Sequence, residues 1–183
     1  PTLDMLELDE KARQAGVSAI IGMGVSPGIS NLLAVKTMGE LDQVEDVYTG
    51  WSIADATVEP PEGGYSPERL KAPDYQPSAA IIHGIHQFTG KIRVYRNGRF
   101  LDERPVKKKR IDYPALGRGC AWTIGHPEPV TLPRYYPDIQ NSFNVFVAPR
   151  KSVSQIRFLA WLVNLRLLSV RKAAIMIEED EIK

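Results

Sequence analysis

The stretch Ser18-Ala-Ile-Ile-Gly-Met-Gly-Val-Ser-Pro-Gly-Ile-Ser-Asn-Leu-Leu-Ala-Val35 decides how this chain is expected to fold. The run from Val17 to Met23 is apolar apart from one serine, which predicts a strand covered on both faces, as in a parallel sheet. Apolar residues recur at helical spacing from Pro27 to about Leu41, and Leu3 to Gln14 predicts an earlier helix that Gly16 ends. The start of the chain therefore predicts a helix, a buried strand and a second helix.

The three glycines of this stretch resemble a dinucleotide-binding turn but do not complete one. Gly22, Gly24 and Gly28 are spaced as G-x-G-x-x-x-G, whereas the turn that opens a dinucleotide-binding βαβ unit is G-x-G-x-x-G. Glu45 and Asp46 stand before the next predicted strand, although the ribose-binding acid is expected at its end. The sequence therefore predicts no complete nucleotide-binding site here.

The same loop carries signals for the start of a helix. The Ser26 hydroxyl is expected to cap free amides, and Pro27 suits the first helical position. The N–H groups of Gly28 and Ile29 would then face an anion or a carbonyl at the positive end of the helix dipole. The alternative is an ordinary capped helix after a tight turn, since every helix N-terminus leaves such amides free.

Length and composition limit the class of protein. A chain of 183 residues fits one domain of ordinary size, and its net charge of +1 gives no reason to expect a nucleic-acid or membrane partner. The single Cys120 excludes an intramolecular disulfide and suits a reducing compartment. No apolar run approaches the ~20 residues of a membrane span, and the sequence does not predict a secretory leader, because no charged stretch is followed by an apolar one. We expect a cytoplasmic protein, and Pro1 in place of Met favours a processed chain or a piece of a longer one.

The rest of the chain alternates predicted strands and helices. A long segment rich in Pro and Gly, from Ala54 to Pro77, predicts a loop. The other expected elements are a strand from Val47 to Ile53, a helix from Ser78 to Phe88, a hairpin of Lys91–Tyr95 and Arg99–Glu103 around Asn97-Gly98, strands at Ala121–Gly125, near Val130 and at Asn144–Ala148, a helix over 156–168 after the capping box Ser152–Gln155, and a helix over Val170–Glu178 capped by Ser169. This order predicts an α/β (α+β) fold in which the tail of a parallel sheet precedes an antiparallel or mixed sheet covered by helices.

At Gly22–Asn31 the chain resembles the saccharopine dehydrogenase family of NAD(P)-dependent oxidoreductases. The likeness continues through the strand at Trp51, the helix at Ser78, the hairpin Tyr95–Gly98 and the segment Gly125–Thr131. Members of this family have an N-terminal Rossmann domain followed by a mixed-sheet domain that closes the substrate cleft and commonly forms a dimer. The resemblance implies that this second domain is of the glyceraldehyde-3-phosphate dehydrogenase-like C-terminal type.

The resemblance also implies a domain layout and an activity. Residues 1–41 would be the last Rossmann elements and the crossing helix, 42–150 the substrate and dimerisation domain, and 151–183 helices that return towards the Rossmann side. The complete protein would transfer a hydride between NAD or NADP and the C–N bond of an amino-acid-derived secondary amine, in lysine or polyamine metabolism. Because the main nucleotide-binding motif is absent from this chain, we expect the chain alone to be inactive.

The expected site residues follow from the same resemblance. Gly24, Val25, Ser26 and Pro27 would line the cofactor cleft, at the carboxyl edge of the sheet. The expected substrate-side residues are Asn31, His126, Glu128 and Arg134. His126 is the candidate catalytic residue because a histidine beside an acid can move protons; its alternative role is to organise the turn.

Two departures from the family pattern concern the substrate. Fungal saccharopine reductases look like Ser-Trp-Ser-x-Arg-Gly where this chain has Tyr75–Ala79, and like Asn-Arg-Asp where it has Glu128–Val130. A dicarboxylate amine needs cationic partners, and a guanidinium is the natural one. The missing arginines leave the substrate open, and Arg134 could replace them if its loop faces the cleft.

Three further features are expected to be structural. His83 and His86 have a spacing that a metal permits, but no cysteine or acid accompanies them, so no metal site is expected. The basic run Arg104–Arg110 favours a solvated edge strand over a nucleic-acid surface. Cys120 is expected to be a small core residue and not a nucleophile.

A second hypothesis belongs to a different class of function. The chain could fold alone as a homodimerising interaction domain without catalytic activity. The residues that favour it lie in the aliphatic tail: Ile156, Leu159, Leu162, Val163, Leu165, Leu167 and Leu168. The same residues could equally belong to a helix that packs against a missing Rossmann domain.

Overall fold

The computed structural model describes residues 2–52, 66–113 and 117–180. Contacts between residues divide the chain into two compact units. Unit 1 comprises Pro1–Thr49, Arg93–Glu103 and His126–Asn144, and unit 2 comprises Gly50–Ile92, Arg104–Gly125 and Val145–Lys183. The domain boundaries at 41 and 150 that the resemblance implies stay a prediction.

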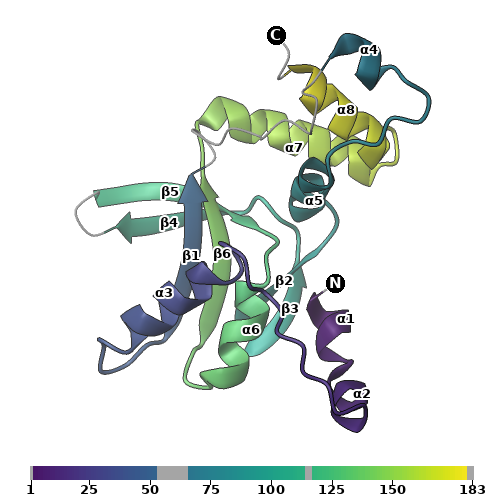
Figure 1. The fold of residues 1–183 in the computed structure, drawn as a ribbon. Helices are drawn as coiled ribbons and strands as arrows, with labels where there is room; N and C mark the ends of the chain where they lie inside the picture. Colours follow the sequence, from purple (N-terminus) through teal and green to yellow (C-terminus); the bar gives the residue numbers. More distant parts are fainter. Residues whose placement is uncertain (1, 53–65, 114–116, 181–183) are drawn as a thin grey trace. The chain divides into compact units, whose positions relative to one another are not determined.

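The strands form one six-stranded sheet (Figure 1). Their order is β3-β2-β6-β5-β4, and β1 pairs with β6 off this path. The β2·β6 pairing is antiparallel, with Tyr95 opposite Ser142, and so is β4·β5. The strands are β1 (Asp46–Ser52), β2 (Ile92–Arg96), β3 (Arg99–Glu103), β4 (Lys108–Tyr113), β5 (Gly117–Ile124) and β6 (Asn141–Val147). A mixed α/β fold with an antiparallel sheet is thereby confirmed, while the finer glyceraldehyde-3-phosphate dehydrogenase-like type stays a prediction.

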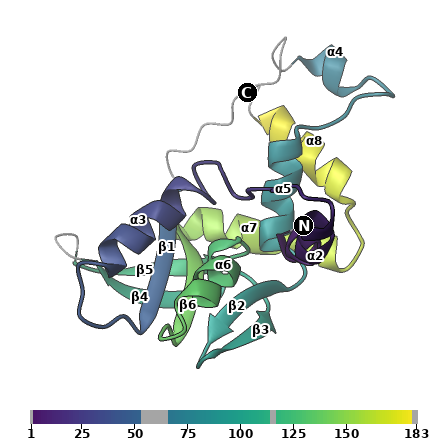
Figure 2. The same ribbon diagram turned by 60° about the horizontal axis from the view of Figure 1, so that its bottom comes forward.

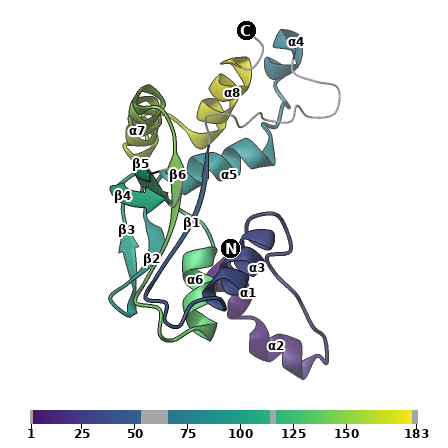
Figure 3. The ribbon, with the colours of Figure 1, turned by 90° about the vertical axis from the view of Figure 1, so that its left-hand side faces the viewer.

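Unit 1 contains the glycine loop and two helices that pack on the sheet. Helices α3 (Ile29–Met38) and α6 (Glu128–Tyr135) lie side by side, as Figures 1 and 3 show. Val47 of β1, Leu132 of α6 and Ile139 form the buried cluster between them, and Met38 of α3 packs against it. Two short helices, α1 (Thr2–Leu6) and α2 (Asp9–Gln14), precede the glycine loop.

Unit 2 contains the remaining helices. Figure 2 shows α5 (Ala79–Phe88) beside α8 (Val170–Asp180), and their contact buries Ile81, Ile85, Ala173 and Ala174. The side chain of Glu178 in α8 is fully buried and accepts hydrogen bonds from the Tyr75 hydroxyl (3.1 Å) and the Ser78 amide (2.7 Å). Glu178 therefore holds the segment that leads into α5 against α8. The other two helices of this unit are α4 (Pro67–Leu70) and α7 (Arg150–Asn164).

Several local predictions are confirmed. Asn97 (φ 49°) and Gly98 (φ 71°) make the turn between β2 and β3 with the left-handed backbone expected of Asn-Gly. The Ser169 hydroxyl accepts from the Lys172 amide at the start of α8. The basic run contributes β4, which ends the sheet order and is thus the predicted edge strand.

Other predicted elements are wrong in their bounds or type. The first helix is interrupted at Glu7 and Leu8, so that two short helices replace one. The strand expected near Val130 is helix α6, because Pro129 stands in the first turn, where a missing N–H leaves no hydrogen bond unmade. The expected capping box at Ser152 lies inside α7, where the Ser154 hydroxyl bonds back to the Arg150 carbonyl.

The strand predicted from Val17 to Met23 does not form. This segment lies outside any helix or strand, and Val17, Ile20 and Met23 are 60%, 78% and 77% exposed. An apolar pattern predicts that the side chains of a segment are buried. A strand forms only where a neighbouring strand also supplies hydrogen-bond partners for its backbone. None of the strands in the described ranges pairs with it.

Two findings concern segments outside the sheet. Most of the predicted loop from Ala54, namely 54–65, lies outside the described residues, and α4 occupies part of the remainder. Among the described residues, no helix has the length and apolar character that a membrane crossing requires.

Candidate functional site

The glycine loop closes on itself. Gly28 has a φ of +139°, and a Cβ atom there would lie 2.0 Å from the Gly24 carbonyl oxygen and 2.8 Å from that of Gly22. The Gly24 amide donates to the Pro27 carbonyl at 2.9 Å, which completes a narrow turn. The missing side chain of Gly28 is therefore required by the backbone of the loop itself. A ligand is not needed to explain it.

The amides at the start of α3 are already occupied. The Ile29 amide donates to the Gly24 carbonyl (3.0 Å), and the Ser30 amide donates to the Val25 carbonyl (2.9 Å). The Gly28 amide donates to Asn31 Oδ1 at 3.2 Å. The Gly28 and Ile29 amides were predicted to face an anion or a carbonyl, and the acceptor of the Gly28 amide is neither but a side-chain amide oxygen. Of the two predicted acceptors, a carbonyl within the loop is the partner of Ile29.

Ser26 and Pro27 precede the helix and do not begin it. Helix α3 starts at Ile29 with Gly28 as its N-cap, and the Ser26 side chain makes no capping bond to this helix. The Ser26 hydroxyl instead donates to Glu128, at the start of α6. The predicted N-cap role is therefore wrong, because the amides of Ile29 and Ser30 that a capping oxygen would serve donate to the Gly24 and Val25 carbonyls.

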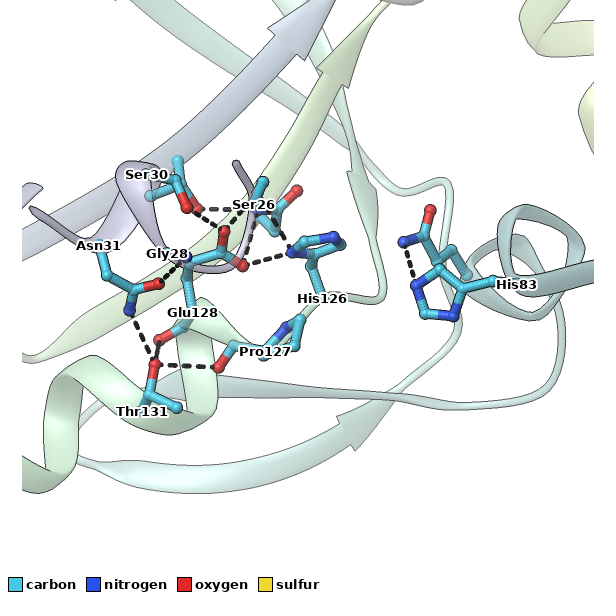
Figure 4. A network of polar contacts seen from close by, with 12 residues as sticks. Ser26, Gly28, Ser30, Asn31, His83, His126, Pro127, Glu128 and Thr131 are labelled. Carbon is cyan, nitrogen blue, oxygen red and sulfur yellow. Dashed lines mark hydrogen bonds and ion pairs between the residues drawn. The ribbon is translucent and has the colours of Figure 1, made fainter. Parts of the chain in front are cut away.

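An anion does lie near the start of α3, and it is the side chain of Glu128. This carboxylate is fully buried, and its Oε1 accepts from the hydroxyls of Ser26 (2.5 Å) and Ser30 (2.6 Å). Its Oε2 lies 2.5 Å from His126 Nδ1 and 3.4 Å from Asn144 Nδ2 (Figure 4). The positive end of the α3 dipole also favours a negative charge at this place. Four side chains from three segments of unit 1 thus converge on one carboxylate.

These contacts determine the charge of Glu128. Burial by itself raises the pKa of this carboxyl group, because a charge is poorly solvated in the interior. The hydrogen bonds from His126, Ser26 and Ser30 outweigh that effect and lower its pKa from 4.5 to about 2. Glu128 is consequently ionised at neutral pH despite its complete burial.

The arrangement around His126 is a dyad and not a serine-nucleophile triad. Glu128 and Ser26 both lie on the Nδ1 side of the ring, at 2.5 Å and 3.5 Å. In a catalytic triad the hydroxyl and the carboxylate bond to opposite ring nitrogens. Ser26 moreover donates its proton to Glu128, so no base activates it. The carboxylate at Nδ1 favours the ring tautomer that carries its proton there.

A second polar link joins the same two helices. Asn31 of α3 donates through Nδ2 to Thr131 Oγ1 of α6 at 3.0 Å, while its Oδ1 accepts from Gly28. Thr131 in turn donates to the Pro127 carbonyl at 3.3 Å (Figure 4). Asn31 therefore uses both ends of its amide to fix the glycine loop against α6.

A cavity of about 1030 Å³ lies beside this junction, entirely within unit 1. Residues of α1, the segment 19–24, α3 and α6 line it. Of the predicted site residues, Gly24, Pro27, Asn31 and Arg134 line the cavity, whereas Val25, Ser26, His126 and Glu128 do not.

His126 and Glu128, both predicted to contact the substrate, are buried. Glu128 is fully buried and its oxygens accept from four side chains, so a substrate contact has no support in this structure. The His126 side chain is 2% exposed. The adjoining Pro127 reaches the cavity lining.

The other candidates have structural surroundings. His83 Nε2 lies 2.9 Å from the Gln87 amide nitrogen one helical turn away, and no cluster of metal-ligating side chains occurs among the described residues. Cys120 is a free, half-buried cysteine that packs against the core cluster of Trp122 and Phe146 in unit 2. The core role predicted for Cys120 agrees with this packing.

Three residues of the polar network were not predicted from the sequence. Ser30 lies in the first turn of α3, four residues after Ser26, and donates to the same Glu128 oxygen. Asn144 interrupts the apolar strand β6, is 1% exposed, and also donates to Thr49 Oγ1 at 2.8 Å. A polar residue inside an apolar strand signals a buried partner. Thr131 carried no such signal.

Comparison with known proteins adds no assignment. No family model matches the chain, and a search of curated proteins finds no matching relative. The likeness to saccharopine dehydrogenases therefore rests on the sequence motifs alone.

Proposed function

We propose that this chain forms the substrate side of an NAD(P)-dependent oxidoreductase of the saccharopine dehydrogenase type, acting on the C–N bond of an amino-acid-derived amine. One observation carries the proposal. Gly24, Pro27 and Asn31 line the same cavity as Arg134, although Arg134 is distant from them in the sequence. The resemblance implies that Gly24 and Pro27 lie beside the cofactor and that Asn31 and Arg134 lie beside the substrate. Because all four line one cavity, the proposal places the reaction there.

The residues around the cavity suit the nicotinamide end of the cofactor better than its pyrophosphate. The amides of Gly28, Ile29 and Ser30 at the start of α3 donate to acceptors within the loop and the helix and are not left for a phosphate. The side chains of Ile20, Met23 and Pro27 give an apolar wall for a flat ring. When bound, NAD(P) would supply or accept the hydride, and the part of the protein is then to bind and orient the amine.

We keep His126 as the candidate for proton exchange with the amine, although its side chain is 2% exposed and does not line the cavity. Reduction of an imine consumes a proton and oxidation of an amine releases one. Glu128 holds the ring through Nδ1. Glu128, Ser26 and Ser30 are then positioning residues that act through the imidazole.

The test uses the complete product of the gene that contains this sequence. Oxidation of NADH and NADPH is followed with imines formed from lysine or a polyamine and a 2-oxo acid, and the reverse reaction is followed with secondary amines. We expect Arg134→Gln to raise KM, His126→Asn to lower kcat, and Arg99→Gln, on exposed β3, to change neither. A folded protein that turns over neither cofactor with any of these substrates would refute the proposal.

The alternative, a homodimerising interaction domain, is favoured by the surface of α7. Phe158, Trp161 and Leu165 are 61%, 53% and 52% exposed, and the first two rings stack with centroids 6.0 Å apart. Of the predicted tail residues, Leu159, Val163 and Leu168 instead pack inside unit 2. Sedimentation tests this alternative: a chain that stays monomeric at high concentration excludes it.

A further inference from the structure

We infer that the cavity of unit 1 binds a small molecule with one carboxylate and an apolar body. This inference deepens the proposed function and rests on it for treating the cavity as the substrate site. It narrows the substrate from amino-acid-derived amines in general to those with a single anionic group. The argument has three parts, which concern charge, apolar surface and polar groups.

Of the two charged residues that line the cavity, only one lacks an ion pair among the described residues. Asp9 and Arg134 are the charged residues that line the cavity. The Asp9 carboxylate is paired with Arg13, its Oδ2 lying 2.8 Å from the guanidinium Nη2. Within the described ranges, Arg134 is exposed and has no ion pair. A free guanidinium matches a carboxylate through two parallel hydrogen bonds, and one guanidinium matches one carboxylate.

The rest of the wall is largely apolar. Ile20, Met23 and Leu32 line the cavity and are 78%, 77% and 70% exposed, so their side chains have no cover within unit 1. The volume of about 1030 Å³ lies at the upper end of the range of ligand pockets. A ligand that fills it beside Arg134 must therefore bring an extended apolar body.

The polar side chains at the α3–α6 junction are not available to a ligand. Asn31 and Thr131 line the cavity, but they bond to each other at 3.0 Å. The other end of the Asn31 amide is used by Gly28, and the Thr131 hydroxyl also bonds to the Pro127 carbonyl. A hydroxyl-rich ligand, such as a sugar, would therefore find its hydrogen-bond partners at this junction already engaged. A dicarboxylate would likewise leave its second charge against apolar side chains.

Octanoate is the probe for this inference. Its binding to the chain is measured by titration calorimetry and by amide shifts in NMR spectra, with octanol, octylamine, octanedioate and octyl phosphate as comparison ligands. We expect saturable binding of octanoate that shifts amides within 20–32 and 127–136. We expect Arg134→Gln to weaken it about tenfold, as for loss of a charge-assisted pair. Arg99→Gln, an exposed arginine on β3 of the same unit, should leave it unchanged.

The inference is overturned by any of four results. Octanol or octylamine could bind as tightly as octanoate, octyl phosphate or octanedioate could bind more tightly, Arg134→Gln could leave the affinity intact, or a chain with well-dispersed amide signals could fail to bind octanoate. Octanoate binding needs no cofactor, so it separates this inference from the proposed function. Octanoate binding without NAD(P)-dependent turnover would refute the proposed reaction and support the carboxylate site. Turnover without octanoate binding would support the reaction and refute the carboxylate site.

Discussion

The replacement Glu128→Gln tests whether one buried carboxylate holds the glycine loop against α6. The pKa of Glu128 is lowered from 4.5 to about 2 in the folded chain, and each pH unit of such a difference corresponds to about 1.4 kcal/mol. The ionised carboxylate therefore contributes about 3 kcal/mol to the free energy of unfolding at neutral pH. A glutamine has no charge and cannot replace this contribution.

The sign of the pH dependence follows from the direction of the shift. A carboxyl group with a folded-state pKa below its unfolded value stabilises the fold above the unfolded pKa, and this contribution is lost as pH falls through the folded pKa. We expect the wild-type chain to exceed Glu128→Gln by about 3 kcal/mol at pH 6. The difference should shrink below pH 4.5, to less than half at pH 3 and to nearly nothing at about pH 2.

The assay is urea unfolding at a series of pH values, followed by far-ultraviolet circular dichroism. Fluorescence is unsuitable because Trp51, Trp122 and Trp161 all belong to unit 2, whereas Glu128 belongs to unit 1. Hydrogen exchange of the α3 amides supplies a local measurement in unit 1. The matched control is Glu40→Gln, an exposed residue of the same unit, for which the difference from the wild type should stay within about 0.5 kcal/mol. A difference for Glu128→Gln that does not change between pH 6 and 3, or one below about 1 kcal/mol at pH 6, would refute the reasoning.

Three further predictions concern the same loop and the hairpin. Ser30→Ala should lower the free energy of unfolding by about 1–2 kcal/mol and raise the pKa of Glu128, since one donor to the carboxylate is lost; NMR titration of the Glu128 carboxyl carbon measures the second effect, and an unchanged pKa contradicts the bond. Gly28→Ala should destabilise the chain by about 3 kcal/mol or more, because its Cβ would overlap the Gly24 carbonyl, whereas Gly84→Ala, with open space around it in α5, should stabilise it by about 0.5–1 kcal/mol; urea unfolding of both variants decides, and equal effects would show that the crowding is absent. Gly98→Ala should cost about 1 kcal/mol because Gly98 has a φ of 71°, while Asn97→Gly should be neutral within about 0.5 kcal/mol; thermal unfolding that ranks the two in the opposite order would contradict the assigned turn.

The parts of the fold that depend on neighbouring residues in sequence were predictable. The turn at Asn97-Gly98 follows from backbone preferences of two residues, and the Ser169 cap follows from one hydroxyl within reach of the Lys172 amide. The sequence also placed His126 beside Glu128, which are two residues apart and do form a pair. Short-range chemistry of this kind needs no knowledge of the tertiary fold.

Predictions failed where a distant residue competes with a local one. Ser26 satisfies every local rule for a helix cap, yet its hydroxyl bonds to a carboxylate 102 residues away. The Val17–Met23 run has the composition of a buried strand, but composition does not say which strand pairs with it. Asn144 could be recognised as a buried polar residue, while its partners Thr49 and Glu128 could be found only from the fold.

The closed glycine loop also has a kinetic consequence. The backbone from Gly24 to Ser30 already makes its hydrogen bonds within the loop, so the entropy of ordering it is lost during folding. A molecule that enters the neighbouring cavity therefore meets a preorganised wall on the side of this loop. Its association rate constant should be set by diffusion and orientation, and changes in affinity should appear mainly in the rate at which it leaves.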